Sequence, residues 1–336
     1  MCYLERVAAF VPESTVPVRK LGELLGLSRG DLRMFTRFLG LDQVAVADGL
    51  ELGDMLTAAG EAALRGTDRD LVSHLIHAHT MQHAAVTRPH LLEEVRQRLG
   101  LRHASAFAMS HLNCVVGLYA LQVARALLAG APAGEKVLIL IGDKALADQA
   151  RLIPDTTIQG DAAAACLVGQ DPRGDRILGS ALRVDGRFYQ CLDCPAELLR
   201  EYRQLYPGSL IQAMRAAMKN ASTDPADISM ILPHNVNTWS WKQISMIAGI
   251  PDGQVYLENV PRIGHCGGCD PFINLATARD NGDVASGDRV VLAAAGLGAA
   301  FAATVIEMGE VEAGVREAGK GAVKEGEAEM GGGSAR

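Results

Sequence analysis

Cys114 is the residue in this sequence whose type and position most clearly suit a role in chemistry. It lies in the stretch 110–121, SHLNCVVGLYAL, where an apolar segment gives way to a helical pattern. The N–H groups and the macrodipole of a helix N-terminus favour a negative charge, so a cysteine at this point forms a thiolate more easily. A thiolate prepared in this way is a common nucleophile. The alternative is a buried structural cysteine, because cysteine is among the most buried residue types.

Two Cys-x-x-Cys pairs offer a second kind of chemistry. They are Cys191 with Cys194 and Cys266 with Cys269. Four thiolates are a common structural zinc site, but these pairs lie much further apart in the chain than the ligands of a zinc ribbon. We therefore expect no bound metal and interpret the four cysteines as small core or loop residues. A structural zinc site and a redox pair are the alternatives.

Composition places the chain among globular proteins without a nucleic-acid partner. The 336 residues are 49% hydrophobic and 21% charged, enough for two domains or one large duplicated fold. The net charge is −7, basic residues are scattered, and 6 Tyr, 7 Phe and 2 Trp offer little base stacking. An acidic partner such as a carrier protein would need a local basic patch.

The start of the chain and its cysteine content predict a cytoplasmic protein. The first residues, MCYLER, lack a charged segment followed by an apolar run, so we expect no secretory leader. No apolar stretch is long enough for a bilayer, so we expect no membrane association. An odd number of cysteines, seven in all, favours a reducing compartment over a disulfide framework.

In the first half of the chain, the elements that must position Cys114 alternate between strand and helix patterns. Strands are expected at 3–10, 71–78, 104–109 and 136–143, and helices at 18–25, 28–39, 55–64, 91–99 and 118–128. Asp54 is expected to cap the third helix. The alanine-rich run 162–168 fits either a helix or a core strand.

The second half repeats this rhythm and ends in a different composition. Helices are expected at 196–218, 240–248 and 272–281, strands at 228–232, 255–257 and 288–295, and a hairpin back through 299–308. These patterns predict an α/β protein with buried sheets, and hint at duplication. Residues 311–336 are mainly Gly, Glu, Lys and Ala, so we predict a disordered tail.

Four segments, taken in order, resemble the thiolase superfamily and, within it, the ketoacyl-acyl-carrier-protein synthase III group. Cys114 with Gly117 resembles the nucleophile segment, and Gly160–Ala165 resembles Gly-Asp-Gly-Ala-Gly-Ala without its internal glycines. The stretch 232–237, LPHNVN, resembles the Pro-His-x-x-Asn motif, and 295–299, AGLGA, resembles the glycine-rich C-terminal loop. The resemblance covers roughly residues 1–310.

This resemblance implies a thiolase-like five-layered αβαβα fold with two pseudo-repeated halves, 1–168 and 169–310, and a homodimer. It also implies that Cys114 takes an acyl group from a thioester of coenzyme A or acyl carrier protein and passes it on, without a further cofactor. His234 would accept the thiol proton or hydrogen-bond the acyl carbonyl. The N–H of Cys114 and that of Leu297 or Gly298 would form the oxyanion hole.

The sequence departs from the family at the third catalytic position. Where the family has an Asn after a Gly, this chain has His265, and Asp270 follows five residues later. An imidazole can act as a general base, and Asp270 would orient it while capping the next helix. In this respect the chain resembles ketosynthase-like acyltransferases of natural-product pathways with a Cys-His-Asp site.

We therefore expect acyl transfer to a hydroxyl or amine of a secondary-metabolite acceptor. The alternatives are decarboxylative condensation of the 3-oxoacyl-carrier-protein synthase III type, a catalytically silent partner subunit, and a thioesterase-like hydrolase. The resemblance also suggests substrate contacts. Arg37, in the stretch MFTRF, resembles a segment that contacts coenzyme A, and Asn235 and Asn237 follow the catalytic histidine. Trp241, close behind them, fits helix packing better than a pocket wall.

Overall fold

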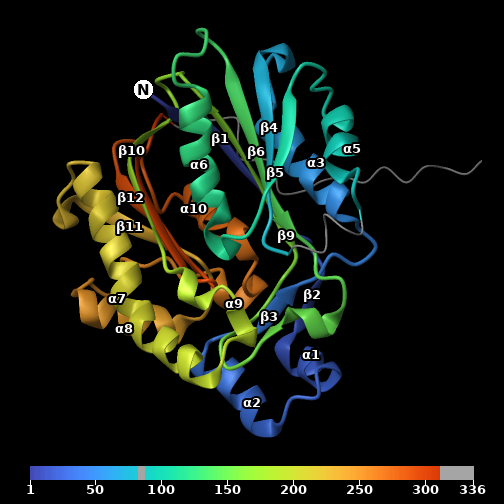
Figure 1. Cartoon of the computed structure of the whole chain (residues 1–336), viewed down its shortest axis with the longest axis vertical. Coiled ribbons are helices and arrows are strands. Elements are labelled where there is room, and N and C mark those ends of the chain that lie inside the picture. The colour runs from blue at the N-terminus through green and yellow to red at the C-terminus, as the bar shows by residue number, and fades with distance from the viewer. Residues whose placement is uncertain (82–87, 311–336) are drawn as a thin grey trace, which may run out of the picture.

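The computed structural model describes residues 1–81 and 88–310, and the predicted tail lies outside this part of the chain. Its main feature is a nine-stranded sheet in the order β11-β12-β13-β10-β1-β9-β6-β4-β5. The sheet bends at its middle, where β1 and β10 share only two residue pairs, Tyr3 with Arg176 and Leu4 with Asp175. It therefore behaves as two half-sheets, as Figure 1 shows.

The strands of this sheet are β1 (Tyr3–Phe10), β4 (Val72–Ala78), β5 (Ser105–Met109), β6 (Lys136–Asp143), β9 (Ala162–Gly169), β10 (Asp175–Val184), β11 (Ile228–Pro233), β12 (Arg289–Gly296) and β13 (Ala300–Glu307). Two small sheets pair β2 (Thr15–Pro17) with β3 (Gln43–Ala45) and β7 (Leu152–Ile153) with β8 (Thr157–Ile158). The described helices are α1 (Val18–Leu24), α2 (Arg29–Arg33), α3 (Leu52–Ala63), α5 (Leu91–Arg98), α6 (Val116–Leu127), α7 (Ala196–Asn220), α8 (Thr238–Ala248), α9 (Val260–Ile263) and α10 (Asp270–Asn281).

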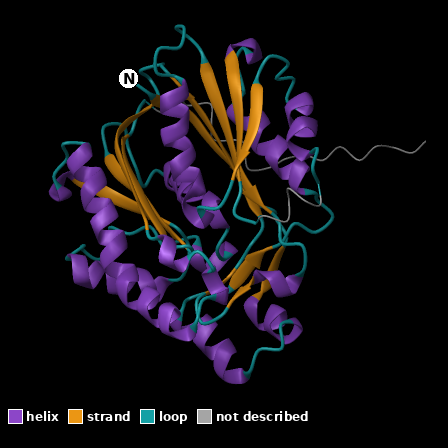
Figure 2. Ribbon diagram, in the orientation of Figure 1, coloured by secondary structure: helices purple, strands orange, loops and turns teal. Residues whose placement is uncertain are grey.

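Helices and half-sheets form five layers. Helices α6 and α10 lie between the two half-sheets, and the largest buried cluster joins them to strands of both (Figure 2). Helices α3 and α5 cover the outer face of the N-terminal half-sheet, while α7 and α8 cover that of the C-terminal half-sheet. This is the αβαβα arrangement that the resemblance implied.

The two half-sheets repeat one connectivity. In the first, β4 runs parallel to β6, which pairs antiparallel with β9, which pairs antiparallel with β1. In the second, β11, β12, β13 and β10 are related in the same way. Helix α6 precedes β6 and α10 precedes β12, so the central helices occupy equivalent places in the two halves. The expected pseudo-repeat is therefore present, while the boundary at residue 168 stays a prediction.

The starts of the two central helices meet at the centre of the molecule. A Cβ atom on Gly117 would lie 2.9 Å from the carbonyl oxygen of Gly268 and 2.8 Å from the ring of Phe272. Only glycine allows this approach, because any side chain at this position would overlap both groups. The segments immediately before α6 and α10 are therefore held against each other.

Most predicted elements are present, and the differences have local causes. The run 162–168 is strand β9, packed on both faces, which explains its unbroken apolar character. The stretch 255–257 is no strand, because Val255 makes only an isolated bridge to Ile231. Strand β10 was not predicted, because partly exposed polar residues interrupt its apolar pattern.

Two expected helices differ in their details. Helix α3 begins at Leu52 rather than after Asp54, because Asp54 is the third residue of a capping box whose N-cap is Glu51. The helix expected at 28–39 is α2, continued by a π-helix over Met34–Phe38.

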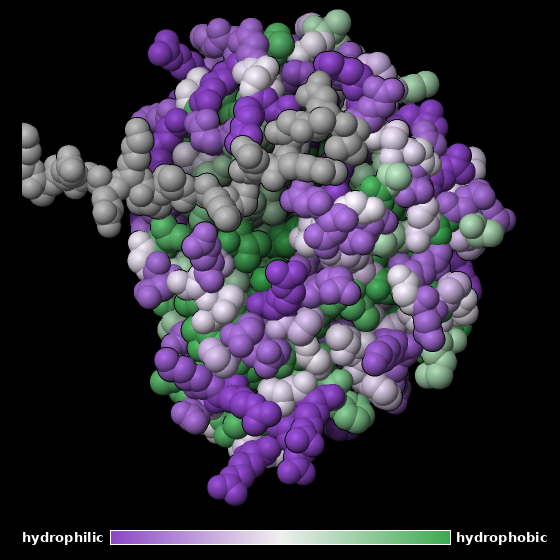
Figure 3. Space-filling view, turned by 180° about the vertical axis from the view of Figure 1, so that it is seen from behind, coloured by the Kyte–Doolittle hydropathy of each residue, from purple (hydrophilic) through white to green (hydrophobic). Residues whose placement is uncertain are grey.

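The outer surface carries both hydrophobic and hydrophilic side chains. On the face opposite to that of Figure 1, hydrophobic side chains reach the surface in groups between hydrophilic ones (Figure 3). Within residues 1–81 and 88–310, none of the helices is long and apolar enough to cross a bilayer.

The family-like segment at Gly160 connects the two halves near their meeting point. Gly160 donates its N–H to the carbonyl oxygen of His265 at 2.9 Å, and its Cα lies too close to Ile263 for any side chain. Asp161 is fully buried and binds the guanidinium of Arg151 through two contacts of 2.8 Å. It also accepts the N–H groups of Ala47 and Ala145. Asp161 thereby anchors the strand end that borders the loop of His265.

We expect Asp161→Asn to lower the free energy of unfolding by about 3 kcal/mol, because it removes the carboxylate that makes the two shortest contacts to the buried guanidinium of Arg151 and leaves the longer ion pair with Asp148. Urea unfolding followed by circular dichroism measures the change. The control is Glu197→Gln, which removes an exposed ion pair with Arg200 and should leave the urea midpoint unchanged. Equal midpoints for wild type and Asp161→Asn would show that the buried pair does not stabilise the fold.

Candidate active site

Cys114 lies in a tight turn at the centre of the molecule. It belongs to a 3₁₀ turn, Asn113–Val115, and helix α6 begins two residues later. The sulfur-bearing side chain is buried, with 7% of the residue exposed. Asn113 has a positive φ of 49°, which bends the chain sharply as it enters this turn. The turn positions the thiol toward the start of α10.

Cys114 is joined directly to His265. The distance between Cys114 Sγ and His265 Nε2 is 3.1 Å. The backbone of His265 is held on both sides, because its N–H donates to the Ile158 carbonyl at 3.1 Å and its carbonyl accepts from Gly160. Gly264, just before it, has a φ of 72° and packs against the same Ile158 carbonyl. The imidazole is therefore fixed by its backbone as well as by its ring nitrogens.

Asp270 completes a chain of hydrogen bonds behind His265. Its Oδ2 lies 2.5 Å from His265 Nδ1, and it also accepts the N–H groups of Cys266 at 2.7 Å and Asn235 at 2.6 Å. Asp270 is fully buried and is the first residue of α10. It is not the N-cap that we expected; Cys269 occupies that position. The short loop over Cys266–Cys269 thus brings Asp270 back under the imidazole.

The charges around His265 favour its protonated form. Burial alone lowers the pKa of His265, but the negative charges of Cys114 and Asp270 outweigh it and raise the pKa well above its ordinary value. Both ring nitrogens have a partner that stabilises the imidazolium. An imidazolium held in contact with a cysteine sulfur can stabilise a thiolate there and act as an adjacent proton donor.

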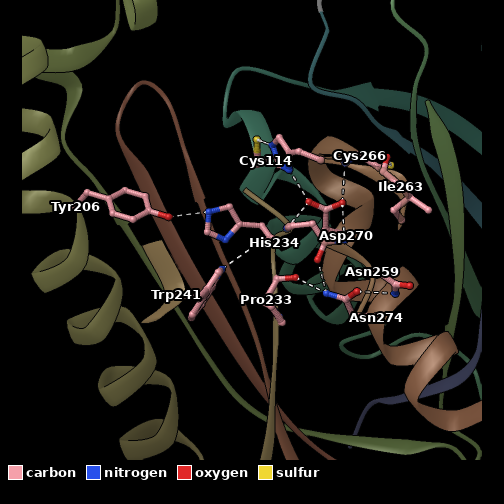
Figure 4. Close-up of polar contacts among 12 residues, drawn as sticks. Cys114, Tyr206, Pro233, His234, Trp241, Asn259, Ile263, Cys266, Asp270 and Asn274 are labelled. Carbon is pink, nitrogen blue, oxygen red and sulfur yellow. Dashed lines mark hydrogen bonds and ion pairs between the residues drawn. The ribbon is translucent and has the colours of Figure 1, made fainter. Parts of the chain in front are cut away.

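Two asparagines that the sequence analysis did not predict as site residues hydrogen-bond to the residues around Asp270. Asn274 on α10 donates to the Pro233 carbonyl at 2.8 Å and to Asn235 Oδ1 at 2.9 Å, and it accepts from Asn259 at 2.8 Å (Figure 4). Asn274 and Asn259 are both buried. The sequence did contain a signal for them, because both asparagines lie within or beside apolar elements, where a buried amide needs hydrogen-bond partners.

His234 lies beside this chain but is not part of it. Its main chain is tied at the end of β11, where its N–H donates to Ala293 and its carbonyl accepts from the Trp241 indole at 2.9 Å. Its Nε2 lies 2.9 Å from the hydroxyl oxygen of Tyr206, and no hydrogen bond in the described chain joins it to Cys114. Burial, followed by the charge of His265, lowers the pKa of His234 to about 3. His234 is therefore a neutral neighbour of the His265 imidazole, with ring centroids 6.1 Å apart.

The turn between β12 and β13 lies directly against the Cys114 turn. A Cβ atom on Gly296 would come within 2.5 Å of the Leu112 carbonyl and 3.2 Å of the Cys114 nitrogen. The Asn113 side chain also donates to the carbonyl of Leu297. The structure thus brings the turn that contains Leu297 and Gly298 next to the Cys114 turn, while their role in an oxyanion hole stays a prediction.

The expected substrate contacts are arranged differently. Asn235 bonds Asp270 and Asn274, whereas Asn237 caps α8 through Ser240 and donates to the Thr156 carbonyl. Both asparagines are buried and have internal partners, so the geometry favours a positioning role for them. Arg37 is exposed on the π-helix.

The paired cysteines lie in separate parts of the site region. Cys266 and Cys269 are buried in the loop that leads into α10, where Cys269 Sγ approaches the Ile141 carbonyl at 3.3 Å. Cys191 and Cys194 precede α7. Among the described residues, no group of three or more His, Cys, Asp or Glu side chains is arranged to hold a metal ion.

The contact between His265 and Cys114 predicts unusual pH dependence of alkylation. We expect iodoacetamide to modify Cys114 faster than Cys191 at pH 6.5, because His265 Nε2 lies 3.1 Å from Cys114 Sγ, whereas burial raises the pKa of Cys191. His265, with its raised pKa, remains protonated there and stabilises the thiolate. Asp270→Asn should slow this alkylation about 10-fold, because it removes the carboxylate that supports the imidazolium.

Intact mass measurement with peptide mapping gives the modification rate of each cysteine. Cys191, which is partly exposed, is the internal control and should react only as the pH rises. Alkylation of Cys114 that follows the same pH profile as Cys191 would contradict the ion pair.

Comparison with known proteins identifies the family of the chain. Residues 110–186 match the family model of 3-oxoacyl-[acyl-carrier-protein] synthase III, and residues 218–308 match the model of its C-terminal region. A β-ketoacyl-[acyl-carrier-protein] synthase III from Streptomyces coelicolor is 26% identical over 277 residues, 78% of this chain and 80% of the relative. A second, from Ruegeria pomeroyi, is 28% identical over 284 residues, 77% and 85% of the two chains.

Solved structures show the same fold. The acyltransferase ChlB3 superposes with a TM-score of 0.82 at 19% identity, covering 92% of this chain and 98% of its own. The 3-oxoacyl-(acyl carrier protein) synthase III of Pseudomonas aeruginosa superposes with a TM-score of 0.79 at 20% identity, covering 93% and 99%. With the nucleophile segment inside one matched region and both histidines inside the other, the chain belongs to the thiolase superfamily as a member of its 3-oxoacyl-[acyl-carrier-protein] synthase III-like family.

Proposed function

We propose that this protein is an acyltransferase that moves an acyl group from a coenzyme A or carrier-protein thioester, through Cys114, to a hydroxyl or amine of a small-molecule acceptor. The observation that carries the proposal is the continuous chain from Cys114 Sγ through His265 to Asp270, with contacts of 3.1 and 2.5 Å. This is the arrangement of a nucleophile, a base and an orienting carboxylate.

In the first half-reaction, the Cys114 thiolate attacks the carbonyl carbon of the thioester. The N–H of Cys114 and that of Leu297 or Gly298 stabilise the oxyanion that forms. The bond to the carrier sulfur then breaks, and this sulfur takes the proton from His265 Nε2 as it leaves. The products are an acyl group on Cys114, a neutral His265 and a free carrier thiol.

In the second half-reaction, His265 works as a base. Its Nε2, released from Cys114, accepts the proton of an incoming hydroxyl or amine while the oxygen or nitrogen attacks the acyl carbon. The bond to Cys114 breaks, and the thiolate returns beside a protonated His265. Asp270 stabilises the imidazolium at both stages, and its bonds to Cys266 and Asn235 keep it in place.

Decarboxylative condensation is the second candidate, because the named relatives are 3-oxoacyl-carrier-protein synthases and His234 is retained. That reaction needs hydrogen-bond donors directed at an enolate oxygen. Here Nε2 of His234 is engaged by Tyr206, and His265 is bonded to Cys114 and Asp270. These contacts favour a base beside the acyl-enzyme over a pair of enolate-stabilising donors.

The reaction partners and the cellular setting belong to the same proposal. Arg37 is exposed and directly precedes Phe38, whose ring pairs with that of Trp239 at a centroid distance of 4.8 Å, and a cation with aromatic rings in the same surface segment suits the nucleotide end of coenzyme A. All seven cysteines are free, which supports a reducing compartment such as the cytoplasm. A secondary metabolite is the acceptor that we propose.

We expect a panel of acyl thioesters to add the mass of one acyl group to Cys114, as seen by intact mass spectrometry. Cys114→Ala should abolish this adduct, and His265→Ala should slow its formation about 100-fold, because the leaving thiolate loses its proton donor. An alcohol or amine acceptor should then shorten the lifetime of the acyl-enzyme.

Malonyl thioesters provide the decisive comparison. Stoichiometric release of CO2 coupled to a β-keto product would contradict the acyltransferase and establish condensation. An acyl-enzyme that decays only to water would indicate a hydrolase, and a Cys114 that no thioester acylates would indicate a silent partner subunit.

We also propose that two copies of the chain pair through β5. This strand ends the nine-stranded sheet, and Ser105, Ala106 and Ala108 on it are exposed. An edge strand with small side chains is able to pair with its own copy about a two-fold axis.

Light scattering should give twice the mass of the 35.6 kDa chain. Ala106→Glu should shift the protein toward the monomer, because it places like charges across the two-fold axis. Ala129→Glu, at another exposed alanine, is the control and should leave the mass unchanged. A wild-type protein with the mass of one chain would contradict the pairing.

A further inference from the structure

A second hydrogen-bonded pair lies next to the Cys114–His265–Asp270 chain. Tyr206, on α7, places its hydroxyl oxygen 2.9 Å from Nε2 of His234. Figure 4 shows Tyr206 reaching His234 from the side opposite Asp270. The tyrosine ring packs edge-on against Phe301, with centroids 6.2 Å apart. The proposed acyl-transfer steps make no use of this tyrosine.

The direction of this hydrogen bond follows from the other ring nitrogen. His234 Nδ1 is buried and has no hydrogen-bond partner in the described chain. Buried N–H groups without a partner are rarer than buried acceptors without one, so the proton belongs on Nε2. His234 is neutral, with a pKa lowered to about 3 by burial, and therefore carries only this one N–H. It donates that proton to the oxygen of Tyr206.

The hydroxyl proton of Tyr206 is then available for another group. Burial raises the pKa of Tyr206 well above 10, so the hydroxyl keeps its proton. Its only described hydrogen-bond partner is the histidine, which already supplies the proton of that bond. A hydroxyl that accepts one hydrogen bond is polarised by it, so its own O–H becomes a stronger donor to a further group.

The position of the pair points to the acceptor molecule. In the second half-reaction, the attacking oxygen must lie within roughly 3 Å of His265 Nε2. The His234 ring, whose centroid lies 6.1 Å from that of the His265 ring, is a polar neighbour of the site for the attacking oxygen. Tyr206 is hydrogen-bonded to His234 and so lies one residue further from His265. An acceptor that carries a second oxygen on the carbon next to its attacking hydroxyl can direct that oxygen from His265 toward this pair.

We propose that Tyr206, held by His234, donates a hydrogen bond to a second oxygen of the acceptor and so selects acceptors with neighbouring oxygens, such as vicinal diols. This rests on the proposed acyl transfer through Cys114. Tyr206 then determines acceptor specificity and leaves the acylation of Cys114 untouched.

The experiment compares two small acceptors that differ by one oxygen. Cys114 is first acylated with hexanoyl-CoA, and intact mass spectrometry follows decay of the acyl-enzyme in matched concentrations of propan-1-ol and propane-1,2-diol. Wild type should transfer to the diol about 10-fold faster, the effect of one good hydrogen bond. Tyr206→Phe should acylate at the wild-type rate and react equally with both alcohols.

Tyr202→Phe is the matched control. Tyr202 lies one turn earlier on α7, packs against the same Phe301 ring, and its hydroxyl has no hydrogen-bond partner in the described chain. This variant should keep the preference for the diol. Equal rates with both alcohols in wild type, a preference that survives in Tyr206→Phe, or slower acylation in that variant would each overturn the proposal. Absence of a wild-type acyl-enzyme with hexanoyl-CoA and with every other thioester of the panel would instead contradict the proposed function itself.

Discussion

The buried carboxylate of Asp270 is the group around which the centre of this protein is organised. An ionised carboxylate without partners is very costly inside a protein, so its hydrogen bonds dictate what surrounds it. Asp270 binds His265 Nδ1 and the N–H groups of Cys266 and Asn235. These contacts tie the loop before α10 to the end of β11, and they leave His265 Nε2 directed at Cys114.

Duplication of the fold explains why this arrangement forms at all. The Cys114 turn precedes α6 and the His265–Asp270 loop precedes α10, at equivalent places in the two halves. The glycine contact between Gly117 and Gly268 brings the two helix starts together. Cys114 from one half therefore meets His265 from the other half at the pseudo-two-fold centre.

The two histidines have opposite electrostatic settings within 6.1 Å of each other. His265 has an anionic partner on each ring nitrogen and its pKa is raised, whereas His234 is buried beside that positive charge and its pKa is lowered. Each setting supports the other, because a neutral His234 avoids repulsion with a charged His265. This separation favours one proton carrier and one neutral hydrogen-bonding group over two equivalent donors.

The sequence by itself determined the α/β class and most elements, because apolar periodicity and turn residues are local properties. It also pointed to His265 and Asp270, through their position in a recognisable motif. Only the tertiary structure decided which histidine contacts Cys114, that Asp270 opens α10 instead of capping it, and that Asn274 contacts Asn235 and Tyr206 contacts His234. These residues lie far from Cys114 in the chain, and their contacts depend on the packing of the two halves, which no local pattern records.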